Sequence, residues 1–298
     1  MSERFEFQIN GKDYKKRLDE FLFAEFPHLS RMYLRELVRD AKCEVNGRWE
    51  NRGYLLRTND FVEVEIDRAR QTSLQPEPIE LEIVYEDAEI LIVAKPPNML
   101  VHPTVGVRTG TLLNALAHHL NAAGPASGEP FARAGLVHRL DKETSGLLAI
   151  AKTLRAHRVL SSHFQRKKVE KRYLALVEGN VVRDSGTIDA PIGRFAESRL
   201  WGVKADGKSS ISNFRVKARY EDATLVELEP VTGRTNQLRI HLAHIGHPII
   251  GDIKYGGREY RRLCLHAWRL GFHHPTTGMW LEFESEFRIP NSEFQIPN

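Results

Sequence analysis

Residues 135–152, GLVHRLDKETSGLLAIAK, place a polar stretch between two apolar runs. Residues 135–137 lead into this stretch and residues 147–150 lead out of it, and neither run contains a charge. Short apolar runs bounded by polar residues are typical of buried elements of secondary structure. The pattern predicts that residues 138–145 form a turn between two buried elements, and such a turn presents its side chains to a cleft from a rigid support.

Length and composition limit the class of protein. A chain of 298 residues has room for a large and a small domain. Its 41% hydrophobic and 28% charged residues are typical of a soluble globular protein. No apolar run reaches the roughly 18 residues of a membrane helix, and the start, MSERFEFQING, lacks the apolar core of a signal peptide. Cys43 and Cys264 are too far apart for a CxxC metal site or a disulfide framework. We therefore expect a cytoplasmic protein with no membrane segment.

Residues 1–66 have the pattern of a small α+β domain. Apolar residues recur at helical spacing over 18–26, and Ser30 is placed to cap a second helix. Asn46-Gly47 predicts a hairpin turn, and the alternation in DFVEVEI at 60–66 predicts a strand. The expected order is helices followed by a small sheet. The helices also carry a basic face, which consists of Lys15, Lys16, Arg17, Arg31, Arg35 and Arg39.

The remaining chain divides into a linker and a larger domain. Residues 67–78, DRARQTSLQPEP, have neither periodicity nor an apolar run, which predicts a linker. Residues 79–298 contain many short strand-like runs but few helical stretches, such as TLLNALAHHL and TLRAHRVLSSHF. This pattern predicts an α+β domain built on a central mixed or antiparallel sheet.

One stretch imitates a nucleotide-binding motif. GVKADGKS at 202–209 matches the spacing of a phosphate-binding loop. Such a loop must open a helix, because the amides at the helix N-terminus hold the phosphates. The residues after Ser209 alternate as in a strand, so we do not expect a nucleotide site there.

Charged residues indicate where chemistry takes place. Asp141 lies between Arg139 and Lys142, so we expect an ionised, paired carboxylate that acts as a nucleophile or a base. Arg234 and Arg239 lie beside glycine-containing turns, and an arginine is suited to clamp a carboxylate with two hydrogen bonds while other basic groups hold phosphates.

A basic run precedes a tyrosine at the start of a predicted strand. RKKVEKR at 166–172 leads into Tyr173, and cations beside an aromatic ring are typical of a platform for unstacked bases. The net charge of +4 is too small to indicate such a partner by itself. Together, these residues indicate a protein that handles RNA or DNA through a site centred on a carboxylate.

Six segments resemble the RluA-type pseudouridine synthase family. They occur in the family's order and span residues 95–275, and they are KPPNMLVHP, HRLDKETSGL, KRYLALVEG, GRTNQLRIH, GHPIIGDIKYG and LHAWRLGFHHP. Residues 1–66 are similar to the alpha-L type RNA-binding domain that precedes the catalytic domain in many members. The glycine usual before the hairpin strand of that domain is replaced around residues 40–42.

The resemblance implies isomerisation of uridine to pseudouridine within an RNA chain. Asp141 would be the catalytic carboxylate, and it would either add to the anomeric carbon or take a proton from the ribose. Arg239 would pair with Asp141 and keep it ionised. Tyr173 would stack on the flipped uracil and relay a proton.

The resemblance also implies substrate-binding residues, with Arg139 filling the gap that the flipped base leaves. The other expected substrate contacts are His138, Arg234 and Gln237. Asn236 departs from the family, in which a histidine is more common at this position, so we expect altered local contacts there.

The implied partner is RNA, most of all large-subunit ribosomal RNA. Transfer RNA remains an alternative substrate, and a non-catalytic RNA-binding assembly factor is an alternative function. The reaction consumes no energy and changes no redox state, so the resemblance implies neither a metal nor another cofactor. We further expect a monomer.

Overall fold

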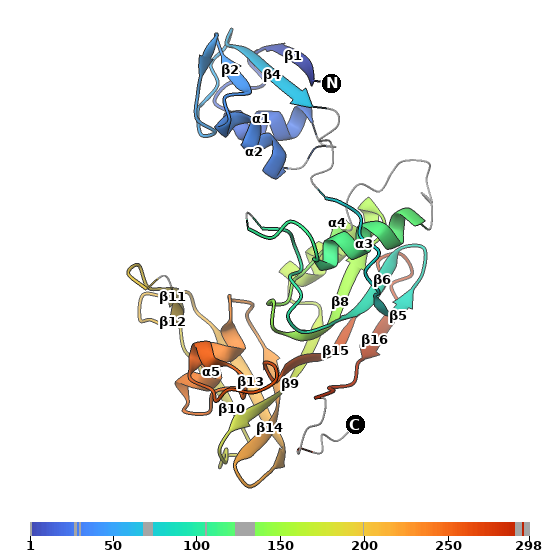
Figure 1. The fold of residues 1–298 in the computed structure, drawn as a ribbon, viewed down its shortest axis with the longest axis vertical. Coiled ribbons are helices and arrows are strands. Elements are labelled where there is room, and N and C mark those ends of the chain that lie inside the picture. The colour runs from blue at the N-terminus through green and yellow to red at the C-terminus, as the bar shows by residue number, and fades with distance from the viewer. Residues whose placement is uncertain are drawn as a thin grey trace. The chain divides into compact units, whose positions relative to one another are not determined.

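The chain forms two compact units, Met1–Gln75 and Pro76–Asn298 (Figure 1). The computed structural model describes residues 2–26, 29, 31–67, 74–104, 106–122, 135–198, 200–289 and 294. The division falls within residues 67–78, for which the sequence predicts a linker. Residues 68–73 of that range and the expected cap Ser30 lie outside the described residues. None of the described helices is long and apolar enough to cross a membrane.

The first unit packs two helices against a four-stranded antiparallel sheet of order β1-β4-β2-β3. Its elements are β1 (Ser2–Gln8), α1 (Leu18–Glu25), α2 (Arg31–Arg39), β2 (Cys43–Val45), β3 (Arg48–Trp49) and β4 (Phe61–Asp67). The expected order of helices before strands is wrong, because β1 precedes both helices and pairs along all of β4. Phe5 and Phe7 alternate with polar and charged residues and pack against the core, and this alternation was the sequence pattern that could have predicted β1.

A ten-stranded mixed sheet forms the second unit, in the order β10-β13-β14-β9-β15-β8-β6-β5, with β16 and β7 paired to β15 and β8. Among the described strands, the pairing of β8 with β15 is parallel and the others are antiparallel. The strands are β5 (Glu82–Glu86), β6 (Ile90–Lys95), β7 (Gly135–Leu136), β8 (Ser145–Ala151), β9 (Glu170–Glu178), β10 (Ser185–Asp189), β13 (Ile211–Arg219), β14 (Ala223–Pro230), β15 (Leu265–His273) and β16 (Trp280–Glu284). The predicted α+β class with a mixed sheet is confirmed.

Two helices cover opposite faces of the half of this sheet that contains β6 and β8. α3 (Leu112–Ala122) packs on the face that carries Leu91 and Val93, whereas α4 (Leu154–Gln165) packs on the face of Ile90 and Ile92. Because side chains alternate along a strand, residues 90–94 of β6 and residues 147–151 of β8 must be apolar to satisfy both layers. This accounts for the uninterrupted apolar run that follows the polar loop.

The other half of the sheet carries α5 (Gln237–His244) and a 3-10 turn, η2 (Ile253–Tyr255). A separate hairpin of β11 (Ile192–Arg194) and β12 (Trp201–Val203) precedes β13. The residues after Ser209 form β13, so the expectation that no helix follows 202–209 is confirmed.

Candidate active site

The loop that carries Asp141 joins β7 to β8, as expected for residues 138–145, and is anchored by a buried lysine. Lys95 is 1% exposed. Its ammonium donates hydrogen bonds to the backbone carbonyls of Pro96 (2.8 Å), Met99 (3.0 Å) and Lys142 (3.0 Å). An ammonium has three N–H donors, so these bonds use all of them. Burial lowers the pKa of Lys95 to about 7. The residue next to Asp141 is thus tied to the end of β6.

His138 secures the other end of the loop. Its Nε2 accepts a hydrogen bond from the backbone N–H of Ala149 (2.9 Å). Its ring stacks on Phe164 of α4, with centroids 4.3 Å apart. Burial lowers the pKa of His138 to about 3, with a smaller contribution from the charge of Lys171. His138 is therefore neutral, and it both holds the loop in place and contributes to the surface of the site.

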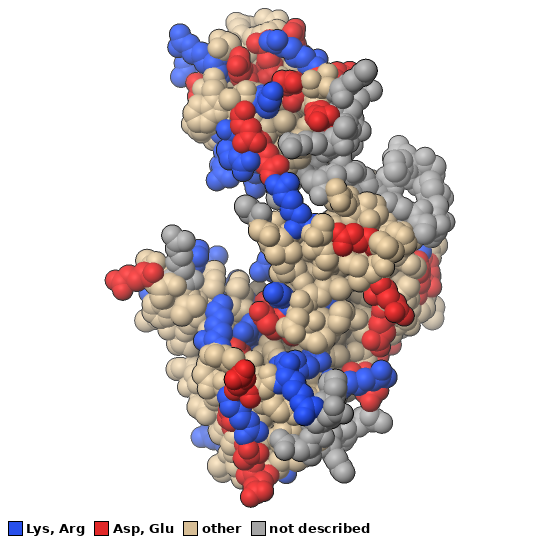
Figure 2. All heavy atoms as spheres, in the orientation of Figure 1, with Lys and Arg blue, Asp and Glu red and all other residues tan. Residues whose placement is uncertain are grey.

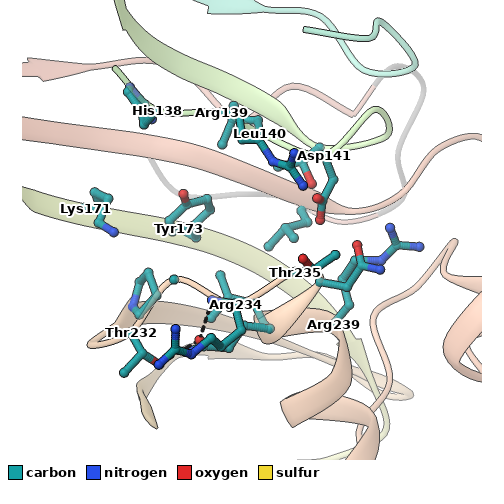
Figure 3. A pocket seen from close by; sticks show the side chains of 17 residues that line it. His138, Arg139, Leu140, Asp141, Lys171, Tyr173, Thr232, Arg234, Thr235 and Arg239 are labelled. Atoms are coloured by element: carbon teal, nitrogen blue, oxygen red, sulfur yellow. Dashed lines mark hydrogen bonds between the residues drawn. The ribbon is translucent and has the colours of Figure 1, made fainter. Parts of the chain in front are cut away.

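A cavity of about 450 Å³ lies beside this loop. Figure 3 shows three groups of side chains around it, from the loop after β7, from β9, and from the segment that leads into α5. Every predicted site residue lines it, namely His138, Arg139, Asp141, Tyr173, Arg234, Gln237 and Arg239, together with Lys171. Figure 2 shows Lys and Arg side chains with fewer acidic ones around the hollowed middle of this unit.

Asp141 faces the cavity without a direct partner. No hydrogen bond or ion pair to its carboxylate occurs within the described part of the chain, so the expected pairing with Arg139 or Lys142 is wrong. Burial raises the pKa of Asp141 above its usual range, and Glu143 raises it further, whereas Arg239, Arg139 and Lys254 act in the opposite direction. The loop thus presents an uncovered carboxylate whose charge is sensitive to its surroundings.

Arg239 pairs with other carboxylates. Its Nε and Nη2 donate to Oδ2 and Oδ1 of Asp252, both at 2.7 Å, and its Nη1 donates to Glu143 at 3.2 Å. The expected direct pair with Asp141 is therefore wrong. Asp252 lies within the segment GHPIIGDIKYG, and its sequence context predicted no role for it. Arg239 acts on Asp141 through its nearby charge.

β9 contributes Tyr173 and Lys171 to the cavity, since residues two apart on a strand share a face. Burial raises the pKa of the Tyr173 hydroxyl, and the charge of Asp141 raises it further. The hydroxyl therefore stays protonated at neutral pH. Burial also lowers the pKa of Lys171, with a smaller contribution from Lys167.

Gln237 is committed to the protein's own structure. Its Oε1 accepts from Thr232 Oγ1 (2.7 Å) and from the backbone N–H of Arg234 (3.0 Å). Its Nε2 donates to the carbonyl of Ile211 and to Ser212 Oγ, both at 2.9 Å. An amide side chain has two donors and two main acceptor positions. Gln237 therefore shapes the segment that carries Arg234, and its expected contact with substrate stays a prediction.

Asn236 begins α5 in the left-handed backbone region, with φ of 54°. Asparagine tolerates this region better than most residues. Its Nδ2 donates to the hydroxyl of Tyr255 (2.9 Å). Arg234 lies exposed at the cavity edge, and its Nε donates to the carbonyl of Ser209 (3.2 Å).

The basic face of the first unit is partly neutralised. Lys16 pairs with Asp13 (2.6 Å), and Arg17 pairs with Asp19 (3.0 Å). Arg35 also approaches Asp19 (3.5 Å), and Arg39 pairs with Asp40 (2.8 Å), while the side chain of Arg31 lies outside the described residues. Figure 2 accordingly shows acidic and basic side chains mixed on this unit.

Comparison with known proteins defines the class of enzyme. A family model of RNA pseudouridylate synthases matches residues 89–244, just over half of the chain. The chain is 42% identical to an uncharacterized RNA pseudouridine synthase of Bacillus subtilis (strain 168), over 91% of this chain and 90% of that protein. It is 39% identical to ribosomal large subunit pseudouridine synthase D of Pseudomonas aeruginosa, over 94% of this chain and 89% of that protein.

A solved structure agrees with these relatives. Human RNA pseudouridylate synthase domain containing 1 has a TM-score of 0.58 at 29% identity, and the match covers 70% of this chain and 83% of that chain. The class is therefore that of enzymes that isomerise uridine in RNA. The chain belongs to the RluA-type RNA pseudouridine synthase family.

Proposed function

We propose that this enzyme converts uridine to pseudouridine in large-subunit ribosomal RNA, with Asp141 as the catalytic carboxylate. The observation that carries the assignment is the uncovered carboxylate of Asp141, which lines the same cavity as Tyr173. A carboxylate held rigidly but left without a partner is free to react.

The isomerisation exchanges one bond of the anomeric carbon for another. The bond from this carbon to N1 of uracil breaks, a bond to C5 forms, C5 loses its proton and N1 gains one. Asp141 either adds to the anomeric carbon or takes a proton from the ribose, and its position beside the cavity serves both routes. The target base must leave the RNA stack to reach it, and the exposed Arg139 would fill the gap.

Arg239 and Tyr173 have supporting parts in this proposal. The charge of Arg239 favours the ionised form of Asp141, although its hydrogen bonds go to Asp252 and Glu143. The ring of Tyr173 would stack on the flipped uracil, and its protonated hydroxyl would serve the proton transfer at C5.

The choice of RNA rests on the relatives and on the small unit. Relatives named ribosomal large subunit pseudouridine synthase D align with 93–94% of this chain, so their similarity includes most of Met1–Gln75. We assign an RNA-binding role to that unit, whose exposed Lys15, Arg35 and Arg39 would contact phosphates. Transfer RNA is the alternative substrate.

The test combines mapping with a single substitution. Pseudouridines are mapped in ribosomal and transfer RNA from cells with and without the gene, and the deletion is complemented with wild type or Asp141→Asn. The expected result is a ribosomal RNA position that loses its pseudouridine and regains it only with wild type. Loss confined to transfer RNA would overturn the substrate, and Asp141→Asn turnover within about tenfold of wild type would overturn the catalytic role.

A further inference from the structure

Two consecutive cations on β9 have different surroundings. Arg172 pairs with Glu170 (3.2 Å) and Glu229 (2.8 Å) on one face of the sheet. Lys171, on the opposite face, lines the cavity, and no carboxylate among the described residues lies within ion-pair distance of its ammonium. A half-buried cation without a counter-ion is costly. Its position in a substrate cavity indicates that a ligand supplies the missing acceptor.

His138 places a second donor beside Lys171. Because Nε2 of His138 accepts a hydrogen bond and the ring is neutral, its proton resides on Nδ1. This N–H has no partner among the described residues. The charge of Lys171 acts on His138, which places the two residues near each other. Both residues line the cavity, so one end of it carries two donors, and no carboxylate of the described residues pairs with them there.

The order of residues along the cavity indicates which part of the substrate reaches this end. The charge of Asp141 raises the pKa of Tyr173, so these two residues are neighbours. The charge of Lys171 lowers the pKa of His138, so these two are neighbours as well. In Figure 3, Tyr173 lies between Lys171 and Asp141. With the ribose at Asp141 and uracil on Tyr173, the far edge of the base points to Lys171, about 7 Å further along β9. The two phosphates stay with the ribose at the other end.

We propose, on the basis of the proposed function, that Lys171 and His138 receive a carbonyl oxygen of the flipped uracil and stabilise the negative charge on the ring while its bond to the ribose is broken. The electron pair of that bond stays with the base and spreads from N1 onto the carbonyl oxygens. Lys171 donates a hydrogen bond and transfers no proton. The same ring electrons then form the bond from C5 to the anomeric carbon. Donors fixed where charge develops accelerate such a step.

The test measures single-turnover rates on a synthetic RNA that contains the uridine mapped above. Lys171→Met is compared with Lys171→Arg, which restores a cation, and with Arg172→Met, which removes the neighbouring charge from the opposite face. We expect Lys171→Met to slow the reaction about 100-fold or more. Lys171→Arg should recover most of that loss, and Arg172→Met should stay within about threefold of wild type.

Modified RNAs identify the group that Lys171 contacts. Sulfur is a weaker hydrogen-bond acceptor than oxygen, so 2-thiouridine or 4-thiouridine at the target should slow wild type but add little to the defect of Lys171→Met. A neutral methylphosphonate on the 5′ side of the target should slow both enzymes equally. Coupling of Lys171 to the methylphosphonate instead would overturn the proposal and make Lys171 a phosphate contact.

Two outcomes separate this inference from the proposed function. Wild type that turns over the RNA while Lys171→Met stays within about threefold of it would overturn the inference alone. Wild type that fails to modify any ribosomal RNA would overturn the proposed function. If Lys171→Met does not fold, as judged by its thermal unfolding, Lys171→Gln replaces it with the same expectations.

Discussion

Arg239 holds Asp252 through two hydrogen bonds of 2.7 Å, and it leaves the carboxylate of Asp141 uncovered. The side chain of Asp252 is completely buried, so this pair is part of the framework of the site. Arg239 is thereby fixed in place while its charge still favours the ionised form of Asp141. A direct pair with Arg239 would occupy the oxygens that the reaction needs.

Asp252→Asn should destabilise the protein, because it leaves the buried Arg239 without its bidentate partner. Breaking a buried pair in this way costs about 3–5 kcal/mol, and we expect the free energy of unfolding to fall by about that amount in urea denaturation. The matched control is Asp206→Asn, which removes the exposed partner of Lys204 and should leave the transition unchanged. Equal effects of both substitutions would show that the buried Arg239–Asp252 pair contributes no more to the free energy of unfolding than an exposed pair does.

Tyr173→Phe should separate binding from chemistry. The ring can still stack on a base, which is worth about 1–3 kcal/mol, so RNA affinity should stay close to that of wild type. The single-turnover rate should fall, because the hydroxyl is absent when C5 loses its proton. Filter binding and rapid quench on the same RNA measure the two quantities. Weaker binding with unchanged chemistry would make Tyr173 a binding residue only.

The acid limb of the pH–rate profile should lie above the pKa of an ordinary aspartate, about 3.9, because burial raises the pKa of Asp141. As the pH falls through that raised pKa, Asp141 gains a proton and the rate drops. Glu143 raises the pKa of Asp141 as well. Glu143→Gln should therefore move the limb to lower pH, and a shift to higher pH would contradict this electrostatic account.

Lys95 predicts a pH dependence of stability. Burial lowers its pKa to about 7 in the folded protein, whereas an unfolded lysine titrates near 10.4. Between these values the unfolded chain binds more protons, so stability rises with pH. The free energy of unfolding of wild type minus that of Lys95→Met should therefore grow by about 1 kcal/mol per pH unit from pH 7 to 9. Urea titrations across this range measure it, and a flat or falling difference would contradict the prediction.

Removal of Met1–Gln75 should leave a folded enzyme, because each unit has its own hydrophobic core. We expect uridine in a short RNA to be isomerised at a rate close to that of the full chain. Long ribosomal RNA should bind more weakly and with a shallower salt dependence, since fewer phosphates are neutralised. Unchanged affinity and salt slope would mean that the basic face of this unit, with its internal ion pairs, is only a solvated surface.

Local features of the sequence were sufficient for several conclusions. The apolar run after residues 138–145 predicted a buried strand that supports the loop, because a strand covered on both faces must be apolar where both layers contact it. The absence of a helix after Ser209 followed from strand alternation in the same way. The first strand was missed because its alternation is short and rich in charge, and its partner β4 lies more than 50 residues away.

Only the tertiary structure decided which groups touch. Arg239 bonds to Asp252, Gln237 turns inward, and Lys95 reaches the carbonyl of Lys142, which is 47 residues away. None of these choices follows from residue types, because an arginine beside a glycine turn can reach any carboxylate that the fold brings near. The parallel pairing of β8 with β15 joins segments that are about 120 residues apart in the sequence. The sequence by itself determined that a carboxylate stands on a rigid loop; the tertiary structure decided that this carboxylate is left uncovered, because it directs Arg239 to Asp252 and Glu143.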